Sequence, residues 1–184
     1  MAAKLKEPAL ILNKRNGVAF FQFPNLARFS GIQHAIFTRN CGYSKGPYKS
    51  LNVSFEVGDN QSKVAENRRV ISRCLDEKNL VFAKQVHGTG VLTFAKDKKN
   101  SSEKVINIPP PGDAMVTDIP NKYLVMQLAD CQSILMYDHV RHVVANVHSG
   151  WRGSINHAYP DVAHTLVQPR RSPGCFHAPL YSPA

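Results

Sequence analysis

Residues 123–147 read YLVMQLADCQSILMYDHVRHVVANV, and this stretch decides the fold because it holds three short apolar runs separated by turns. The runs cover residues 123–128, 133–137 and 142–147. Short apolar runs rich in β-branched and aromatic residues and bounded by turn signals are typical of β-strands. We therefore expect three strands here, with residues 138–141 as the loop of an antiparallel hairpin between the last two.

The same hairpin predicts which side chains face one another. With residues 138–141 in the loop, Tyr137 pairs with His142. Continuing that register places Cys131 opposite His148. Directly opposite residues of an antiparallel pair have Cβ atoms about 4.5 to 5.5 Å apart. A thiolate and an imidazole at that separation can share one metal ion, provided that no bulge shifts the register.

Towards the amino terminus the pattern predicts two further strands and a loop. Residues 17–23 and 32–38 are short, aromatic and β-branched, and Pro24 and Gly31 bound them. A glycine-punctuated loop over residues 39–50 follows.

The clearest helical pattern covers residues 60–79, where the apolar side chains fall on one stripe and the charged residues lie elsewhere. The stripe consists of Val64, Ile71, Cys74 and Leu75. Asn60 or Ser62 can cap the first turn through its side-chain oxygen. The sequence therefore predicts a helix over this segment.

Two more strands are expected on either side of a turn at His87-Gly88. Residues 80–84 and 90–95 have the composition of strands. Residues 96–112 end in three prolines and a glycine and show no periodicity, so we expect a mobile surface loop there.

The composition is that of one globular domain, since 43% of the 184 residues are hydrophobic and 20% are charged. The formal net charge of +10 favours anionic partners, but the Lys and Arg residues are scattered. A phosphate-bearing small molecule fits this charge as well as nucleic acid does, and solubility alone is a further explanation. We expect no nucleic-acid partner. No membrane span is expected either, because no window approaches 18 consecutive apolar residues.

The cysteines indicate a reducing environment. They are widely spaced, with no Cys-x-x-Cys pair, and the first 16 residues lack the apolar segment of a secretion signal. The four are Cys41, Cys74, Cys131 and Cys175. We therefore expect a cytoplasmic protein.

Three residues have the chemistry of a metal site. His87 precedes a glycine in a turn, and Cys131 and His148 lie at predicted strand ends. Two imidazoles and a thiolate can hold zinc and leave its fourth position open, which is the pattern of catalytic rather than structural zinc sites. A metal-free alternative is a Cys131 nucleophile activated by one of the imidazoles. Asp130 is available to orient an imidazole, although an Asp in a turn needs no such role.

Two arginines are candidates for binding an anionic substrate. Arg39 and Arg152 each lie beside a glycine-containing segment, where a guanidinium can bind phosphate or carboxylate through two parallel hydrogen bonds. A surface salt bridge explains either residue equally well. The only tryptophan, Trp151, is expected to pack against the core rather than to stack on a substrate base.

Nine short segments follow one another in a specific order between residues 36 and 153. They are Phe37-Thr38-Arg39, Gly42-Tyr43-Ser44, Ser50-Leu51-Asn52, Gly58-Asp59, Glu66-Asn67-Arg68, Gln85-Val86-His87-Gly88, Asp113-Ala114-Met115-Val116-Thr117, Ala129-Asp130-Cys131 and His148-Ser149-Gly150-Trp151-Arg152-Gly153. One such segment is a weak signal, whereas the ordered series is specific. Together the segments resemble the YfiH-like, or laccase-domain, family, which is described both as polyphenol oxidases and as purine nucleoside phosphorylases.

The resemblance implies an α+β fold of layered mixed β-sheets flanked by helices. It places the family's zinc-binding His, Cys and His on His87, Cys131 and His148. It also places Arg39 and Asn52 near the active site, as candidates for binding substrate or phosphate. The implied reaction is phosphorolysis of inosine, adenosine and S-methyl-5′-thioadenosine to free base and sugar 1-phosphate, with adenosine deamination as a companion activity.

The tail of the chain departs from this resemblance. Residues 1–155 are expected to form the YfiH-like domain, whereas residues 156–184 contain five of the twelve prolines, only three charged residues and no sustained period. Members of the family usually continue with a helix, another strand and a further cysteine-bearing motif, which the tail does not resemble. We expect the domain to be incomplete at its C-terminal end and the tail to be poorly ordered.

Three function classes follow. The leading one is a zinc-dependent purine nucleoside phosphorylase, whose partners are purine nucleosides and phosphate. A copper-dependent polyphenol oxidase needs many clustered imidazoles, and the eight histidines include no His-x-His pair. A catalytically impaired binding or remnant protein fits the unfamiliar tail. Cys41, Ser133 and Ser149 also differ from the residues usual in the family, but none of these changes removes a proposed ligand.

Overall fold

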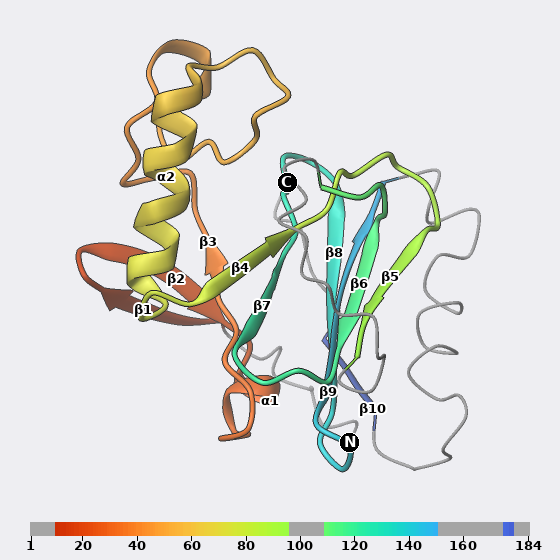
Figure 1. The fold of residues 1–184 in the computed structure, drawn as a ribbon. Helices are drawn as coiled ribbons and strands as arrows, with labels where there is room; N and C mark the ends of the chain where they lie inside the picture. Colours follow the sequence, from red (N-terminus) through yellow and green to blue (C-terminus); the bar gives the residue numbers. More distant parts are fainter. Residues whose placement is uncertain (1–9, 96–108, 151–174, 179–184) are drawn as a thin grey trace, which may run out of the picture. The chain divides into compact units, whose positions relative to one another are not determined.

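The computed structural model describes residues 10–95, 109–150 and 175–178. The chain divides into two compact units, Met1–Glu77 and Lys78–Ala184 (Figure 1). Mixed β-sheets with few helices make up the described residues, so the predicted α+β class is confirmed.

The first unit contains a three-stranded antiparallel sheet in the order β1-β2-β3. β1 spans Ile11–Arg15, β2 spans Val18–Gln22 and β3 spans Ile36–Phe37. β1 and β2 form a hairpin whose two turn residues, Asn16 and Gly17, both have positive φ, at 50° and 81°. A type I′ turn requires this backbone geometry, and Asn-Gly adopts it readily.

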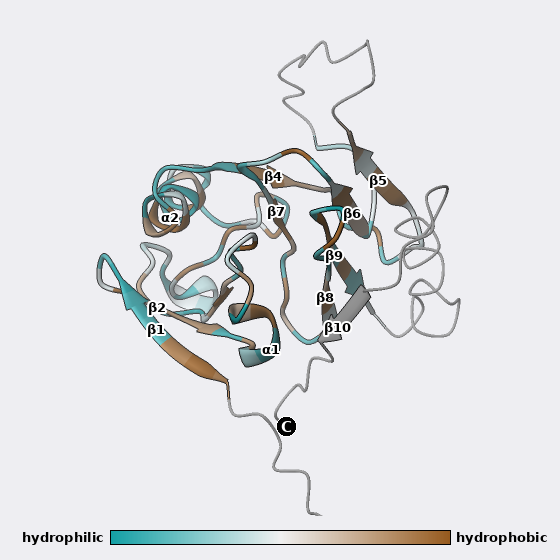
Figure 2. Cartoon of the chain, turned by 90° about the horizontal axis from the view of Figure 1, so that it is seen from below, coloured by the Kyte–Doolittle hydropathy of each residue, from teal (hydrophilic) through white to brown (hydrophobic). Residues whose placement is uncertain are grey.

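One long helix, α2 at Gln61–Cys74, packs against this sheet (Figure 1). Asn60 caps its first turn, because the Asn60 side chain accepts a hydrogen bond from the Lys63 backbone N–H at 3.2 Å. In Figure 2 the helix carries both hydrophobic and hydrophilic residues, as expected for a helix that buries one face. The cluster between helix and sheet consists of Val18, Phe20, Ala35, Phe37, Val70 and Cys74. Two short helices complete the unit, α1 at Pro24–Ala27 and the 3₁₀ helix η1 at Gly46–Tyr48.

The second unit is built on a five-stranded mixed sheet in the order β10-β8-β9-β6-β5. The strands are β5 at Val91–Phe94, β6 at Ala114–Thr117, β8 at Gln132–Asp138, β9 at Val143–Ser149 and β10 at Cys175–Ala178. β5 and β6 are parallel, and the other neighbours are antiparallel. β10 belongs to the 156–184 tail, and the rest of that tail lies outside the described residues.

The middle of this sheet is apolar. All four residues of β6 are buried. The buried cluster around β6 consists of Ala114, Val116, Met136, Ala145 and Val147. Burying a large aliphatic side chain stabilises a fold by about 1.5 to 3 kcal/mol, so this cluster holds the three central strands, and the residues at their ends, in fixed register.

A two-stranded parallel pair lies beside the larger sheet of the second unit. It joins β4 at Asn79–Phe82 to β7 at Lys122–Val125. The side chain of Asn146 in β9 donates a hydrogen bond to the Leu124 carbonyl in β7 at 3.1 Å. This bond ties the pair to the larger sheet.

The predicted hairpin between β8 and β9 is present, but its predicted register is wrong. Ser133, not Cys131, pairs with His148, and the loop consists of residues 139–142 rather than 138–141. Cys131 nevertheless keeps the same face as His148. The reason is that the shift moves the partner position by two residues, and the side-chain period of a strand is two.

Asp138 is the cause of the shifted register. Asp138 is 1% exposed, and its Oδ1 atom accepts hydrogen bonds from the backbone N–H groups of Val140 at 2.9 Å and Arg141 at 3.1 Å. An Asp that bonds the backbone two and three residues further on closes a turn from the last strand position. Asp138 therefore ends the strand instead of opening the loop.

Several other boundaries differ from prediction. The segment 32–38 is strand only at Ile36–Phe37. The reason is that His34 bonds to the Gln22 side chain through its carbonyl and to the Phe23 N–H through its ring, rather than through a strand ladder. The helix predicted over 60–79 ends at Cys74, since Asp76 and Glu77 both have φ of 60°. Five short elements are not predicted from the sequence: β1, β6, β10, α1 and η1.

Two further expectations concern the loop over residues 96–112 and the lack of a membrane span. The loop predicted over 96–112 is described only from residue 109, where Pro111 bridges to Lys84. Among the described residues, no helix has the length and apolar character that crossing a membrane requires.

Candidate metal centre

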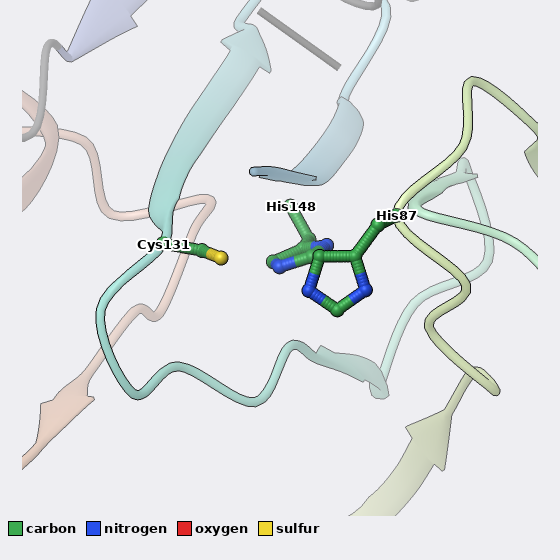
Figure 3. A group of neighbouring side chains, drawn as sticks. All are labelled: His87, Cys131 and His148. Carbon is green, nitrogen blue, oxygen red and sulfur yellow. The ribbon is translucent and has the colours of Figure 1, made fainter. Parts of the chain in front are cut away.

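Three side chains that could hold a metal ion converge in the second unit. His87 lies in the loop between β4 and β5, Cys131 directly precedes β8, and His148 is the penultimate residue of β9 (Figure 3). One possible ligand atom of each residue lies within 4.8 Å of the other two. Ligands of one tetrahedral zinc ion lie about 3.3 to 3.6 Å apart, given Zn–N near 2.0 Å and Zn–S near 2.3 Å. Small side-chain adjustments would therefore bring all three onto one ion.

The surroundings of the three residues differ. His87 is exposed, Cys131 is half-buried and His148 is buried. The group therefore extends from the interior of the unit to its solvent-exposed surface. A substrate or water could reach a bound ion from the His87 side, which is what an open fourth position requires.

His148 is held by Asp113 through both its backbone and its ring. The His148 N–H donates to the Asp113 carbonyl at 2.7 Å, and the His148 Nδ1 atom lies 2.8 Å from the Asp113 Oδ1 atom. The two side chains are only 3% and 2% exposed. With Nδ1 engaged, Nε2 is the ring nitrogen that remains for a metal ion.

His87 occupies a left-handed turn, with φ of 58°. The Asp113 carboxylate accepts hydrogen bonds from this turn as well. Its Oδ1 atom accepts from the His87 N–H at 2.9 Å, and its Oδ2 atom accepts from the N–H groups of Gly88 at 2.8 Å and Val86 at 3.3 Å. These bonds offset the strain of positive φ at a non-glycine residue. The His87 and His148 rings meet edge to face, with centroids 4.9 Å apart.

Two glutamines join the segment that carries His87 to the segment that leads to Cys131. The Gln85 side chain donates to the Gln127 carbonyl at 2.9 Å, and the Gln127 N–H donates to the Gln85 side-chain oxygen at 2.8 Å. This reciprocal pair fixes the spacing of the two segments.

The backbone at Gly150 passes close to two of the proposed ligands. A Cβ atom at this position would lie 2.9 Å from His87 Cδ2 and 3.4 Å from Cys131 Sγ. The first distance is shorter than a normal van der Waals contact. A side chain at position 150 would therefore have to displace the His87 ring.

The surroundings of Cys131 disfavour its thiolate when no cation is bound. Burial, then the adjacent Asp130 carboxylate, and to a lesser extent Asp113, raise the pKa of Cys131 above its ordinary value. The sulfur contacts Asp130 Oδ1 at 3.6 Å. A metal-free nucleophile needs the opposite shift, a lowered pKa. A cation bound at the sulfur would instead favour the thiolate.

Asp113 is the site residue that sequence reasoning missed. Asp130 stood out on sequence because it adjoins Cys131, yet the carboxylate that holds an imidazole is Asp113. The sequence signal for Asp113 is weak. Asp113 follows a proline-rich stretch and opens one of the segments that resemble the YfiH-like family, but nothing in its spacing points to His87 or His148.

Arg39, a proposed substrate ligand, lies in the first unit and organises its own loop. Its Nε and Nη2 atoms donate to the Lys49 carbonyl at 2.9 and 2.5 Å. Its carbonyl accepts the N–H groups of Ser50 and Leu51. The side chain itself is exposed to solvent.

Asn52, the second proposed substrate ligand, also belongs to the first unit and is part of a polar network. Its side chain donates to Asp59 Oδ2 at 2.9 Å and accepts from the Ser54 N–H at 3.1 Å. The fully buried Asn67 of α2 donates to the Asn52 carbonyl at 2.7 Å. Hydrogen bonds from Asn52 and Ser44 lower the pKa of Asp59. This network pins the loop before α2 to the helix.

Arg152 and Trp151 lie outside the described residues. The structure therefore brings together the three proposed metal ligands, all in the second unit. Arg39 and Asn52 lie in the first unit, where their side chains form hydrogen bonds with nearby loop residues.

The observations above define a class: an α+β protein of mixed sheets with a His-Cys-His group that could hold a metal ion. A family model described as "Multi-copper polyphenol oxidoreductase laccase" matches residues 33–179. The chain belongs to this laccase-like, or YfiH-like, family.

Several similar proteins are named purine nucleoside phosphorylase. The purine nucleoside phosphorylase of Bacteroides thetaiotaomicron is 30% identical over 142 residues, which cover 76% of this chain and 53% of that protein. Purine nucleoside phosphorylase YlmD of Geobacillus stearothermophilus is 28% identical over 165 residues, covering 80% of this chain and 60% of that protein. The crystal structure of YlmD from Geobacillus stearothermophilus matches with a TM-score of 0.73 at 26% identity, covering 87% of this chain and 60% of that chain. The chain thus spans between 53% and 60% of the length of these relatives.

Proposed function

We propose that the chain binds zinc through His87, Cys131 and His148 and acts as a zinc-dependent purine nucleoside phosphorylase. The observation that carries the proposal is the convergence of three ligand atoms within 4.8 Å. One of these ligands is oriented by a buried carboxylate, which is the usual arrangement of a metal-binding histidine. Three relatives named purine nucleoside phosphorylase, between 28% and 31% identical, support the reaction class.

The proposed substrates are inosine, adenosine and S-methyl-5′-thioadenosine together with inorganic phosphate. The products are the free base and a sugar 1-phosphate, and adenosine deamination is a companion activity. When bound, zinc supplies a Lewis acid that polarises an oxygen of substrate or water. Arg39, Asn52 and Arg152 are the proposed substrate ligands, whose task is to hold phosphate and nucleoside in a reactive orientation.

The contacts of Arg39 are compatible with this task. Its guanidinium donates to the neutral Lys49 carbonyl, and the side chain is exposed. A phosphate dianion is a stronger acceptor than a carbonyl and takes two parallel N–H groups at once. Arg39 can therefore exchange the carbonyl for phosphate without leaving a buried group unpaired.

The test of this function is base release. Purified, zinc-loaded protein is incubated with inosine and phosphate, and hypoxanthine and ribose 1-phosphate are measured by chromatography. We expect both products, and we expect neither without phosphate. No base release from a folded, zinc-loaded sample would overturn the phosphorylase. Conversion of adenosine to inosine without phosphate measures the companion deamination separately.

A copper site is the second candidate, because the matching family model is described as a laccase. Two imidazoles and one thiolate also suit a single copper ion. Multicopper chemistry needs additional clusters of ligands, and residues 10–95 and 109–150 contain one group of three or more metal-binding side chains close enough to share an ion. Elemental analysis decides between the two metals. Stoichiometric copper together with phenol oxidation would replace zinc in the proposal.

Two further assignments belong to the proposal. We propose residues 1–155 as the YfiH-like domain and residues 156–184 as its divergent tail, from which β10 joins the sheet of the second unit. We also propose a cytoplasmic location, supported by three described cysteines that are unpaired.

The alternative that the chain is a catalytically impaired remnant predicts a broad melting transition and little bound metal. The proposed enzyme instead predicts cooperative unfolding.

A further inference from the structure

Asp113 is buried in the second unit, yet it is neither one of the proposed ligands nor part of the apolar core. It is 1% exposed, and its carboxylate has four hydrogen-bonding neighbours. Three are the consecutive backbone N–H groups of Val86, His87 and Gly88, and the fourth is the ring nitrogen Nδ1 of His148. A buried carboxylate with four donors is fully satisfied, so its position is tightly defined.

We propose that Asp113 is the positioning residue of the metal centre and aligns both histidine ligands through one carboxylate. The inference rests on the proposed zinc site. Asp113 Oδ1 is shared between the His148 ring at 2.8 Å and the His87 N–H at 2.9 Å. One atom thus sets the ring of one ligand and the backbone of the other. A displacement of this oxygen moves both histidines together.

Asp113 also selects the tautomer of His148. An ionised carboxylate only accepts hydrogen bonds, so His148 Nδ1 must carry the proton that it donates. In the neutral imidazole the other nitrogen, Nε2, is then unprotonated and available as a ligand. Asp113 therefore leaves His148 ready to bind a metal ion.

The charge of Asp113 suits a divalent cation. A thiolate at Cys131 and the carboxylates of Asp113 and Asp130 place several negative charges around the site. A divalent ion compensates more of this charge than a monovalent ion does, next to the buried His148 and Asp113 side chains, which are 3% and 2% exposed. Uncompensated buried charge is unfavourable, so these groups favour a divalent ion over monovalent copper.

A purely structural alternative is that Asp113 only caps the turn at His87. The two roles separate at the His148 ring. In Asp113→Asn, an Asn oxygen in place of Oδ2 still accepts the N–H groups of Gly88 and Val86, while the amide group in place of Oδ1 faces both His148 Nδ1 and the His87 N–H as a donor. The His148 proton must then move to Nε2, the nitrogen that would bind metal. The positioning role predicts a defined His148 tautomer together with loss of metal affinity in the variant, whereas simple turn capping predicts no particular tautomer.

Zinc affinity is the first measurement, made by competition with a chromophoric chelator on the 184-residue chain. Asp113→Asn is expected to bind zinc about 10- to 100-fold more weakly than the wild type, the usual effect of removing a partner of a metal-binding histidine. Asp76→Asn is the matched control, because it removes an exposed carboxylate of the first unit that pairs with Arg15 and lies on no proposed ligand. We expect it to change zinc affinity by less than about threefold. Circular dichroism confirms that both variants are folded.

The second measurement needs no variant. Nitrogen-15 NMR of the wild-type protein without metal, at alkaline pH where imidazoles are neutral, reports which nitrogen of His148 carries the proton. We expect Nδ1–H, and Nε2–H would overturn the positioning role. A wild type that binds no zinc would overturn the proposed function itself. A wild type that binds zinc, with folded Asp113→Asn binding it equally well, would overturn only the role of Asp113.

Discussion

Cys131 supplies the sulfur of the proposed metal centre, so its replacement acts on the site directly. A serine hydroxyl is a far poorer zinc ligand than a thiolate. We expect Cys131→Ser to lower zinc affinity by more than about tenfold, since loss of an outer-sphere partner alone has an effect of 10- to 100-fold. The measurement is zinc per chain by elemental analysis after dialysis. Cys41→Ser, at an exposed thiol of the first unit, is the control and should retain full zinc content. Unchanged zinc in Cys131→Ser would remove the sulfur from the ligand set.

Gly150 gives a prediction that depends on shape rather than on donor chemistry. In Gly150→Ala the new methyl group would lie 2.9 Å from the His87 ring, and the exposed His87 side chain would yield before the buried backbone does. We expect His87 to shift away from the other ligands and zinc affinity to fall by roughly tenfold, with little loss of stability. Gly90→Ala is the matched control, because a Cβ there meets only Gly112 Cα, at an ordinary 3.6 Å. If both variants bind zinc equally, close approach at Gly150 has no bearing on the site.

His34 predicts a dependence of stability on pH. Its Nε2 atom accepts a hydrogen bond from the Phe23 N–H at 2.8 Å, and burial lowers the pKa of His34 below its ordinary 6.5. As pH falls through 6.5, the unfolded chain takes up a proton on this imidazole before the folded chain does. The contribution of neutral His34 to stability is therefore complete above about pH 6.5 and decreases as pH falls towards the lower folded pKa.

The comparison that isolates His34 uses His34→Gln, which keeps a side-chain acceptor but does not titrate. Urea unfolding of wild type and variant is measured at pH 7.5 and pH 5.5. We expect the free energy of unfolding to fall more in the wild type than in the variant over this range. Equal losses would show that other groups account for the pH dependence.

The sequence identified three of the four residues on which the proposed site rests. His87, Cys131 and His148 stand out because few residue types bind transition metals, and because each lies at a turn or strand end. Asp113 does not stand out, because carboxylates are common and its role exists only through contacts with segments 26 and 35 residues away. A side chain whose role depends on contacts with residues distant in sequence has no recognisable pattern in the sequence around it.

At the scale of secondary structure, the start of α2 offers a direct comparison of two candidate caps. The sequence allowed Asn60 or Ser62, and in the structure the Asn60 side chain accepts from the Lys63 N–H. We expect Asn60→Ala to lower the free energy of unfolding by about 1 kcal/mol, the usual effect of losing an N-cap. Ser62→Ala should change it by less than about 0.5 kcal/mol, because that position lies inside the first turn on the helix surface. Chemical denaturation checks both values, and a larger effect at Ser62 would contradict the assigned cap.

The same scale shows where sequence patterns succeed and where they fail. The helix and the strands of the second-unit hairpin were predicted because long periodic segments and apolar runs carry strong local signals. The register of β8 and β9 was not, because it depends on whether Asp138 ends a strand or opens a turn, and Asp serves both purposes. β6 has four residues, all buried, so it shows no alternation. The first hairpin had a strong signal, the Asn16-Gly17 turn, which was overlooked.

At the scale of the whole molecule, the two compact units carry different parts of the proposed enzyme. The three proposed metal ligands and Asp113 belong to Lys78–Ala184, and Arg39 and Asn52 belong to Met1–Glu77. The sequence predicts one domain over residues 1–155, because composition and length are ordinary for one domain. The division of that stretch into two compact units depends on contacts between residues, which composition and length do not report. The three proposed ligands are separated by up to 61 positions in sequence, so the proposed metal binding requires a folded second unit.

The location of all three proposed ligands in the second unit predicts where zinc stabilises the chain. A metal that binds only the folded state stabilises it by about 2.7 kcal/mol at a free concentration 100 times its dissociation constant. Because every proposed ligand lies in the second unit, we expect zinc to slow hydrogen exchange in peptides covering β6, β8 and β9. Peptides covering β1 and β2 should change little. Cys131→Ser should show no zinc-dependent protection in either unit. Equal protection of both units would mean that they unfold together, and no protection in the wild type would contradict the metal centre.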